Sequence, residues 1–416
     1  MRIFKFGGAS VKDANGVKNV AKVLQTEGTK DVLVVISAMG KMTNAFELVV
    51  NSYVKNDGDL KNHIDFIEDF HKTMIEELFN SSSNTISSKV NQLFGELSGF
   101  LATNTSKNYN YIYDQIVGFG ELLSTTIVSS YLSQIGINNQ WLDVRELIKT
   151  DNNYRDAKIN WKETQDLIKK NINTSLLNIT QGFLGGYNNE TTTLGREGSD
   201  YTAGIFAYCL HAESVTIWKD VEGVLNADPR VFSDTTLLQE ISYTEAIEMA
   251  FYGASVIHPK TIQPLEQKNI PLYVRSFEDT SKKGTCVGRG KGVYPEIPCY
   301  IVKKNQVLIS IAAKDFSFMV EDNISDVFKK LHEHKLKVNL IQNSAISFSV
   351  CIEDKFLNFD DFLVDLQSKF NIKTYKNVTL YTIRHFNDEA INSIKKRGKS
   401  IIRQINTETA QLVIQE

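Results

Sequence analysis

Several features that mark common classes of protein are scarce or absent in this chain of 416 residues. Its 4 cysteines form no Cys-x-x-Cys pair, which argues against a disulfide framework and against a structural zinc site. No uninterrupted apolar run approaches the ~20 residues of a membrane helix, and the first residues contain no hydrophobic signal region. We therefore expect a cytoplasmic protein that has no membrane contact.

Positive charge is not in excess either. The chain carries 46 Lys and Arg against 49 Asp and Glu, and its net charge is -3. The basic residues are scattered along the chain, so we expect no nucleic-acid partner. A hydrophobic fraction of 42% is ample for well-buried cores, and the length predicts two or three domains.

Proline is scarce and unevenly placed, because all 6 prolines follow residue 228. The stretch 281–298 combines proline with glycine and lysine, and we predict a linker there. Before it, β-branched runs such as 31–36 alternate with helical patterns. This alternation predicts an open, mostly parallel α/β sheet sandwiched by helices, spanning residues 1–290. Further strands are expected at 140–144, 176–179, 214–218 and 271–274.

Residues 62–101 depart from this alternation. Their apolar spacing predicts two helices joined by a loop at 81–84. Two interpretations of this helical excursion stay open, a lid over a site and a purely structural insertion.

The segment 299–416 has the pattern of a small α+β region in two copies. The first copy is expected to contain strands at 300–302, 306–311, 338–341 and 346–352, and helices at 324–331 and 359–370. The second is shorter, with strands at 378–383 and 410–414 and a helix at 390–394. Such paired modules bind small effectors or pair subunits, and a dimerisation appendage without a ligand is an equal alternative.

A lysine and two adjacent glycines follow the first predicted strand. Residues 5–10 read Lys-Phe-Gly-Gly-Ala-Ser, and Ser10 with Asp13 fits a capping box that opens a helix. Glycines let backbone N–H groups approach an anion, and a helix N-terminus favours negative charge. The spacing matches neither GxxxxGK[ST] nor GxGxxG, so a phosphate site and a structural turn are both compatible with it.

Polar segments also follow other predicted strands or open predicted helices. They are residues 37–44, 118–121, 195–200, 219–230 and 256–260. Each has a structural interpretation by itself, as a helix cap, a dipole-matching acid or a solvated surface charge. Ligands of open α/β sheets bind outside the carboxyl ends of the strands, where these segments are expected to lie.

In this order, the segments resemble the aspartate kinases of the amino acid kinase superfamily. The resemblance covers residues 1–290 and rests on segments 5–11, 118–124, 195–203, 218–230 and 251–261. The tail is similar to the paired ferredoxin-like ACT regulatory domains of that family. The strand before the first ACT unit joins the second in that family, so 300–302 is expected to pair with the C-terminal module.

The resemblance implies transfer of the γ-phosphoryl group of ATP to the side-chain carboxylate of L-aspartate. This reaction is the first step of lysine, threonine and methionine biosynthesis. A carboxylate is already a nucleophile at pH 7, so no general base is needed. Lys5 and Lys260 would neutralise the phosphoryl group, and Asp200 would orient both lysines. Mg²⁺ would be held mainly by the ATP phosphates, with no metal-binding residues of the protein.

By the same resemblance, the other site residues form two groups. The aspartate pocket would consist of Ser37, Thr43, Glu121, Phe183, Arg196 and Ser199. Arg196 would bind the α-carboxylate of aspartate and Glu121 its ammonium. The nucleotide would lie against Lys5, Gly7, Gly8, Ser10, Lys219, Asp220, Arg230 and Lys260.

The chain departs from the family pattern at a few positions. Glu197 replaces a glycine beside Arg196, and Lys219 replaces a threonine. In the tail, Asn339 stands where lysine-inhibited relatives carry an acidic residue, and Ser344-Ala345 stands where they carry a Ser-Glu pair. We predict weak or absent lysine feedback, with threonine, another effector or no effector as open choices, and a homodimer formed through the ACT units.

Two alternatives remain besides the aspartate kinase. One is a related amino acid kinase that acts on glutamate or an N-acyl amino acid. Glu121 and Arg196 together suit a substrate that is a free α-amino acid, which argues against this alternative. The other is a catalytically silent regulatory subunit, which the presence of Lys5, Asp200 and Lys260 disfavours.

Overall fold

The computed structural model describes residues 1–79, 84–254, 257–315 and 317–416. The chain divides into two compact units. Unit 1 comprises Met1–Val224, Leu237–Ile247 and Ile257–Gly292, and unit 2 comprises Leu225–Thr236, Glu248–Val256 and Val293–Glu416. None of the described helices combines the length and apolar character that crossing a membrane requires.

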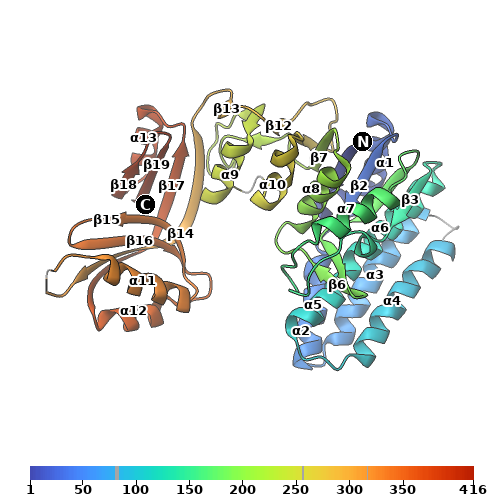
Figure 1. Ribbon diagram of the computed structural model, residues 1–416, viewed down its shortest axis with the longest axis horizontal. Coiled ribbons are helices and arrows are strands. Elements are labelled where there is room, and N and C mark those ends of the chain that lie inside the picture. Colours follow the sequence, from blue (N-terminus) through green and yellow to red (C-terminus); the bar gives the residue numbers. More distant parts are fainter. Residues whose placement is uncertain (80–83, 255–256, 316) are drawn as a thin grey trace. The chain divides into compact units, whose positions relative to one another are not determined.

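A large, mostly parallel sheet forms the centre of unit 1, as the sequence predicts (Figure 1). Its strands in unit 1 lie in the order β10-β12-β11-β7-β1-β2-β4-β3. They are β1 (Arg2–Phe6), β2 (Val32–Ile36), β3 (Asn139–Leu142), β4 (Leu177–Gln181), β7 (Ser214–Lys219), β10 (Glu240–Ser242), β11 (Leu272–Ser276) and β12 (Thr285–Gly288). All five residues of β2 are buried, as expected for a strand covered on both faces.

Helices surround this sheet. They are α1 (Ala14–Glu27), α2 (Met42–Lys55), α3 (Leu60–Phe79), α4 (Asn84–Thr103), α5 (Tyr109–Val117), α6 (Phe119–Gln134), α7 (Trp161–Asn171), α8 (Gly198–Leu210), α9 (Tyr243–Tyr252) and α10 (Pro259–Lys268). α6 packs against β3 and β4, and α8 packs against β1 and β7. Both helices begin near the carboxyl ends of strands, so their first turns contribute to that edge of the sheet.

The two predicted helices of the 62–101 excursion are confirmed as α3 and α4. Each turns an apolar face inward, with Ile67 and Met74 buried on α3 and Val90 and Leu97 on α4. Of the loop expected between them, residues 81–83 lie outside the described residues.

The expected linker at 281–298 is wrong in part, because β12 lies inside it and belongs to the main sheet. β12 runs antiparallel to β11, and Thr285 and Val287 are fully buried. The strand has only four residues, and the glycines in and around it hide its pattern in the sequence. A second short strand in this stretch, β13 (Val293–Tyr294), lies in unit 2.

The predicted capping box at Ser10 is also wrong. Residues Gly8–Val11 form a 3-10 turn, and α1 begins after Asp13, whose carboxylate accepts from the Gly16 N–H at 2.8 Å. Asp13 is therefore the N-cap, because the extra turn displaces the helix start by three residues.

A six-stranded antiparallel sheet forms the body of unit 2, in the order β15-β16-β14-β17-β19-β18. The strands are β14 (Cys299–Ala313), β15 (Lys337–Asn343), β16 (Ser347–Glu353), β17 (Phe370–Arg384), β18 (Lys399–Ile405) and β19 (Thr409–Gln415). The helices are α11 (Glu321–Glu333), α12 (Phe359–Gln367) and α13 (Asp388–Lys395). This α+β arrangement confirms the fold class predicted for the C-terminal region.

The strand β14 runs through both halves of unit 2. Its first part pairs with the end of β17, Tyr300 opposite Ile383, which confirms the pairing expected for 300–302. Its second part pairs with the start of β17, Ile311 opposite Ile372, and with β16 on its other side. The helix expected at 359–370 ends at Gln367, because the chain enters β17 at Phe370. β18 was not predicted, since exposed polar residues interrupt its apolar pattern.

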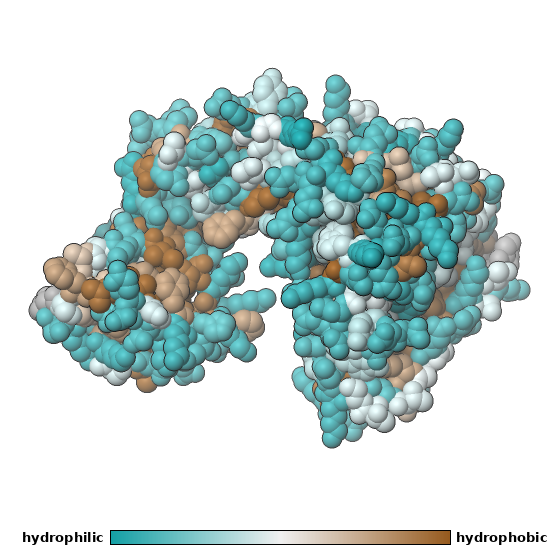
Figure 2. All heavy atoms as spheres, viewed as in Figure 1, coloured by the Kyte–Doolittle hydropathy of each residue, from teal (hydrophilic) through white to brown (hydrophobic). Residues whose placement is uncertain are grey.

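Exposed apolar side chains gather on one end of unit 2. Figure 2 shows brown and tan spheres over the region that carries α11, β15 and β16 in Figure 1. Those of large size and high exposure are Phe318, Val320, Ile341, Ile346, Phe356, Leu357 and Val364. An apolar surface of this kind is typical of a region that binds a partner.

Candidate active site

The carboxyl ends of four neighbouring parallel strands meet at one edge of the main sheet. Phe6 at the end of β1 lies opposite Ile36 of β2 and Trp218 of β7, and Ile36 lies opposite Gln181 of β4. The residues that follow these strands therefore share one edge. The first residues after β1, β2 and β4 are Gly7, Ser37 and Gly182. The last residue of β7 is Lys219. Most of the predicted site segments therefore converge at this edge.

Lys5 and Asp200 form a buried ion pair at this edge. The Lys5 Nζ lies 2.6 Å from the Asp200 Oδ1, and only 11% and 6% of the two side chains is exposed. Lys5 is carried by β1, and Asp200 lies in the first turn of α8. A Cβ placed on Gly7 would lie 3.4 Å from the Lys5 Nζ, so the ammonium folds back over the glycine turn. The pair fixes a positive group beside backbone that can reach an anion.

Gly8 allows two loops to pack closely. A Cβ at this position would lie 2.7 Å from the Gly40 carbonyl oxygen and 2.8 Å from that of Ala38. The Gly40 N–H donates to the Gly8 carbonyl at 3.0 Å. The turn after β1 thus touches the turn after β2, and any larger residue would separate them.

Ser10 faces the protein interior. Its hydroxyl donates to the Trp218 carbonyl at 3.4 Å, and the side chain is buried. The residue therefore joins the turn after β1 to the end of β7, which holds Lys219.

Glu121 presents a buried carboxylate to the same edge from the first turn of α6. Its Oε1 accepts from the Ala38 N–H at 3.4 Å, whereas its Oε2 has no hydrogen-bond partner among the described residues. Burial raises the pKa of Glu121 to about 8. The Ser124 hydroxyl donates to the Ser37 carbonyl at 2.7 Å and ties α6 to the turn after β2. A buried carboxylate with a free oxygen is a receptor for a cationic group.

Phe183 and Ser199 lie together beside the glycines of their segments. A Cβ at Gly182 would lie 2.5 Å from the Ser199 side chain, and one at Gly198 would lie 2.6 Å from the Phe183 ring. Phe183 has a left-handed backbone, φ 71°, and its N–H donates to the Thr202 hydroxyl at 3.0 Å. These close approaches bring the start of α8 onto the end of β4.

Arg196 and Glu197 are exposed at the start of α8. Glu197 is the N-cap residue with φ 55°, a left-handed conformation that glycine adopts more easily. Thr43 lies half-buried in the first turn of α2, the helix that follows the turn after β2. These three residues all come from the predicted segments.

Lys260 is placed beside Asp156, and this differs from the expected pairing with Asp200. Its ammonium forms an ion pair with the Asp156 carboxylate near the N-terminus of α10. Asp156 also lies against Gly195, because a Cβ there would be 2.9 Å from its Oδ1. Residues 255–256, within the resemblance segment 251–261, lie outside the described residues.

The remaining nucleotide candidates separate between the units. Lys219 ends β7 in unit 1 and Asp220 follows it, exposed. Arg230 belongs to unit 2, where its guanidinium pairs with Asp228 at 2.8 Å and is 87% exposed.

Sequence reasoning missed some residues of this edge. The Ala38 N–H, Gly182 and Asp156 carry no motif by themselves, since their roles depend on contacts between distant segments. The glycine at 182 directly follows β4, and that position was the one available signal. Among the described residues, no group of three or more His, Cys, Asp or Glu side chains is arranged to hold a metal ion.

Comparison with known proteins places this geometry in a family. Residues 1–276 match the model of the amino acid kinase family. Lysine-sensitive aspartokinase 3 of Escherichia coli is 32% identical over 356 residues, covering 84% of this chain and 78% of that protein. The chain belongs to the amino acid kinase family, and within it to the aspartokinases.

Other relatives agree. Aspartokinase 1 of Arabidopsis thaliana is 30% identical over 367 residues, covering 84% of this chain and 63% of that protein. The chain spans only 39% of the bifunctional aspartokinase/homoserine dehydrogenase 2 of the same plant. The crystal structure of E. coli aspartokinase III in complex with lysine and aspartate superposes with a TM-score of 0.83 at 27% identity, covering 100% of this chain and 96% of that one.

Proposed function

We propose that this protein transfers the γ-phosphoryl group of ATP to the side-chain carboxylate of L-aspartate, giving 4-phospho-L-aspartate and ADP. The observation that carries the proposal is the buried Glu121 carboxylate, with its free oxygen, at the edge that holds the Lys5–Asp200 pair. The Glu121 carboxylate suits the ammonium of an amino acid, and the Lys5 ammonium suits a phosphate. Relatives solved with aspartate, and with aspartate and ADP, support this assignment.

Two anions must meet in this reaction, so catalysis depends on positive charge and positioning. An oxygen of the aspartate side chain attacks the γ-phosphorus, and the bond to the oxygen bridging the β and γ phosphorus atoms breaks. Lys5 neutralises the negative charge on the phosphoryl oxygens, and Asp200 holds the ammonium in place. No proton has to be removed from the attacking carboxylate at neutral pH.

The aspartate would be held at both ends of its backbone. Glu121 would bind its ammonium and Arg196 would bind its α-carboxylate in a bidentate manner. Ser37, Thr43, Phe183 and Ser199 would complete the pocket.

The nucleotide would lie along the turn after β1. Gly7 and Gly8 would donate backbone N–H groups to phosphate oxygens, while Ser10 supports the turn. Lys219, Asp220, Arg230 and Lys260 are the further candidates, and Lys260 would exchange its Asp156 partner for phosphate. Mg²⁺ would be coordinated mainly by the phosphates. Asp200 is already paired with Lys5, and no group of acidic side chains among the described residues is arranged to hold a metal ion.

Hydroxylamine trapping of acyl phosphate tests the proposal. The protein is incubated with ATP and Mg²⁺ and, in separate reactions, L-aspartate, L-glutamate or an N-acyl amino acid. We expect hydroxamate with L-aspartate. A signal with glutamate alone would assign a related amino acid kinase, and no signal with any acid would assign a silent regulatory subunit.

We propose that unit 2 is the regulatory region, with two ACT units and a weak response to lysine. Asn339 is already engaged: its Nδ2 donates to the Gln306 Oε1 and its Oδ1 accepts from the Lys303 Nζ, both at 2.7 Å. Neither Asn339 nor Ala345 offers a carboxylate to a free lysine. Steady-state kinetics with added lysine test this, and a micromolar inhibition constant would contradict it. Threonine, another effector and no effector are the open choices for this region. The same assay with each candidate effector in place of lysine tests them.

A homodimer is proposed through unit 2. The exposed apolar side chains of that unit, and β15 at the edge of its sheet, support such pairing. Light scattering after gel filtration measures the mass directly. A cytoplasmic location is proposed as well, since the wide spacing of the 4 cysteines in the sequence argues against a disulfide framework.

A further inference from the structure

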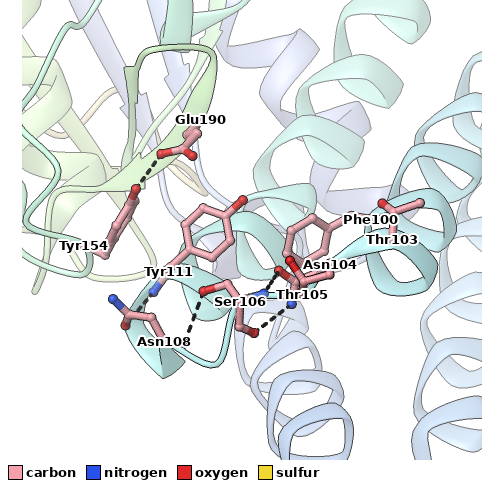
Figure 3. Close-up of a pocket in the computed structure, with 9 residues that line it drawn as sticks. All are labelled: Phe100, Thr103, Asn104, Thr105, Ser106, Asn108, Tyr111, Tyr154 and Glu190. Carbon is pink, nitrogen blue, oxygen red and sulfur yellow. Dashed lines mark hydrogen bonds between the residues drawn. The ribbon is translucent and has the colours of Figure 1, made fainter.

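A second hollow lies in unit 1, lined by residues other than those of the candidate active site (Figure 3). It opens where α4 ends, where α5 begins and at the first residue of β6 (Glu190–Thr193), and its volume is about 500 Å³. This volume is ample for a small organic molecule.

Three aromatic rings line this hollow. The ring centroids of Tyr111 and Tyr154 are 5.3 Å apart at an interplanar angle of 78°, and those of Phe100 and Tyr111 are 6.1 Å apart at 57°. Figure 3 shows the Tyr111 ring between the other two. The rings are tilted against one another, so they present π-faces and edges in different directions. Such faces carry negative electrostatic potential and attract cations.

Glu190 adds a full negative charge to the same hollow. Its Oε2 accepts from the Tyr154 hydroxyl at 2.5 Å, which leaves the Oε1 available to a ligand. Burial is the largest cause that raises the pKa of Tyr154 and of Tyr111. The next cause is the hydrogen bond to Glu190 for Tyr154 and the charge of Glu190 for Tyr111.

Two helix ends meet at this hollow. α4 ends there with Thr103, and α5 begins there at Tyr109, behind its N-cap Asn108. The partial charges of a helix C-terminus and a helix N-terminus are opposite in sign, so the rings and Glu190 decide which charge the hollow favours. No Lys, Arg or His is among the described residues that line the hollow.

We propose that this hollow binds a small organic cation, an ammonium or quaternary ammonium group carried on an apolar body. The cation would lie against the faces of the tyrosine rings and pair with the free oxygen of Glu190. The apolar body would pack on Phe100. The aromatic faces and the carboxylate both favour positive charge, and a neutral or anionic ligand would use only part of this surface.

Isothermal titration calorimetry of the full chain tests the proposal with three benzyl or phenyl probes that differ in charge. They are benzyltrimethylammonium, benzyl alcohol and benzenesulfonate. We expect saturable binding of the cation and at least tenfold weaker binding of the other two, a ratio of the size that cation–π contacts provide. Equal binding of benzyl alcohol, preference for benzenesulfonate or no saturation with the cation would each overturn it.

Substitutions locate the binding. Glu190→Gln keeps the shape and removes the charge, and should weaken binding of benzyltrimethylammonium by about tenfold. Tyr111→Leu removes a ring and should weaken it similarly, which provides a second variant should the first not fold. The matched control is Glu77→Gln, an exposed acid on α3, which should leave the affinity unchanged. Unchanged affinity in both Glu190→Gln and Tyr111→Leu would place the cation elsewhere and reject the site.

Discussion

The two units of this protein bury different kinds of side chain. Unit 1 buries acidic and basic side chains at the carboxyl edge of its sheet, with Lys5 9%, Glu121 2% and Asp200 4% exposed. Among the described residues of unit 2, the buried acidic or basic side chain is that of Arg384, whose guanidinium contacts Glu408 and Thr409. Burying charge costs free energy unless a partner compensates it. The comparison indicates that unit 1 keeps part of its buried charge for a ligand, whereas unit 2 uses its buried groups for stability.

The apolar clusters of unit 2 show the other side of this comparison. One cluster includes Phe348 and Phe362 between the sheet and α11 and α12, and another includes Ile391 and Ile394 of α13. These apolar side chains carry no polar group that could bind a ligand. Substitutions in the two units should therefore change different measured quantities.

The largest expected effect is on the stability of unit 2. Phe362→Ala removes a fully buried ring and should lower the free energy of unfolding by about 3 to 5 kcal/mol. Phe356→Ala, in which the replaced ring is 59% exposed, is the matched control and should change it by less than about 0.5 kcal/mol. Chemical denaturation followed by circular dichroism measures both. Equal losses in the two variants would remove the assigned difference between core and surface.

The next effect is on turnover. Lys5→Ala removes the charge that faces the phosphoryl group and should lower kcat by about 10²- to 10³-fold. The variant should remain folded and still bind aspartate, because the proposed partners of aspartate, Glu121 and Arg196, are unchanged. Lys22→Ala, an exposed lysine on α1, should keep normal kcat. Near-normal turnover in Lys5→Ala would return the turn after β1 to a purely structural role.

The third effect is on aspartate affinity and its pH dependence. Glu121→Gln removes the proposed partner of the substrate ammonium and should raise KM for aspartate roughly 100-fold, with a smaller change in kcat. In the parent protein, burial raises the pKa of Glu121 to about 8, so the ligand-free carboxyl holds a proton at neutral pH. KM should therefore fall as pH rises toward 8 and then level off.

The same pKa sets the sign of a stability effect. Between the ordinary glutamate pKa and about 8, the folded state keeps a proton that the unfolded state has released. The contribution of Glu121 to the free energy of unfolding should thus decrease as pH rises through this range. A pH-independent KM in the parent, or the same pH profile in Glu121→Gln, would rule out the assigned role.

The smallest effect concerns Glu197. Glu197→Gly removes a side chain from a left-handed position and should raise the free energy of unfolding by about 0.5 to 1 kcal/mol. Removal of the negative charge beside Arg196 should also lower KM for aspartate about twofold. His211→Gly, at the left-handed C-cap of the same helix, should give a stability gain without any change in KM. Identical KM changes in the two variants would contradict the charge effect.

Much of the fold could be predicted because its signals are local. The β-branched run of β2 predicts a strand, and the apolar stripes of α3 and α4 predict helices, each from residues that are close together in the sequence. The glycine segments predicted which residues end strands, and the order of these segments indicated the family.

The rest depends on contacts that no local pattern contains. β12 is short and β18 is polar, so each is recognised only from its pairing, β12 with β11 and β18 with β19. The Asp156 partner of Lys260 comes from a loop 104 positions away in the chain, so the expected pairing with Asp200 followed only from the motif. The free oxygen of Glu121 could likewise not be predicted from the sequence, because it results from the packing of α6 on the turn after β2.

The strand β14 has a consequence for how unit 2 could be taken apart. It spans Cys299–Ala313 and contributes hydrogen bonds to both α+β copies, pairing with Arg384 at one end and with Phe370 at the other. A protease cut or stop codon between the copies would leave one continuous strand with half its partners. The two modules are separate in sequence pattern, but β14 and its partner β17 both run through the two of them, so unit 2 should be gained, lost or unfolded as a whole.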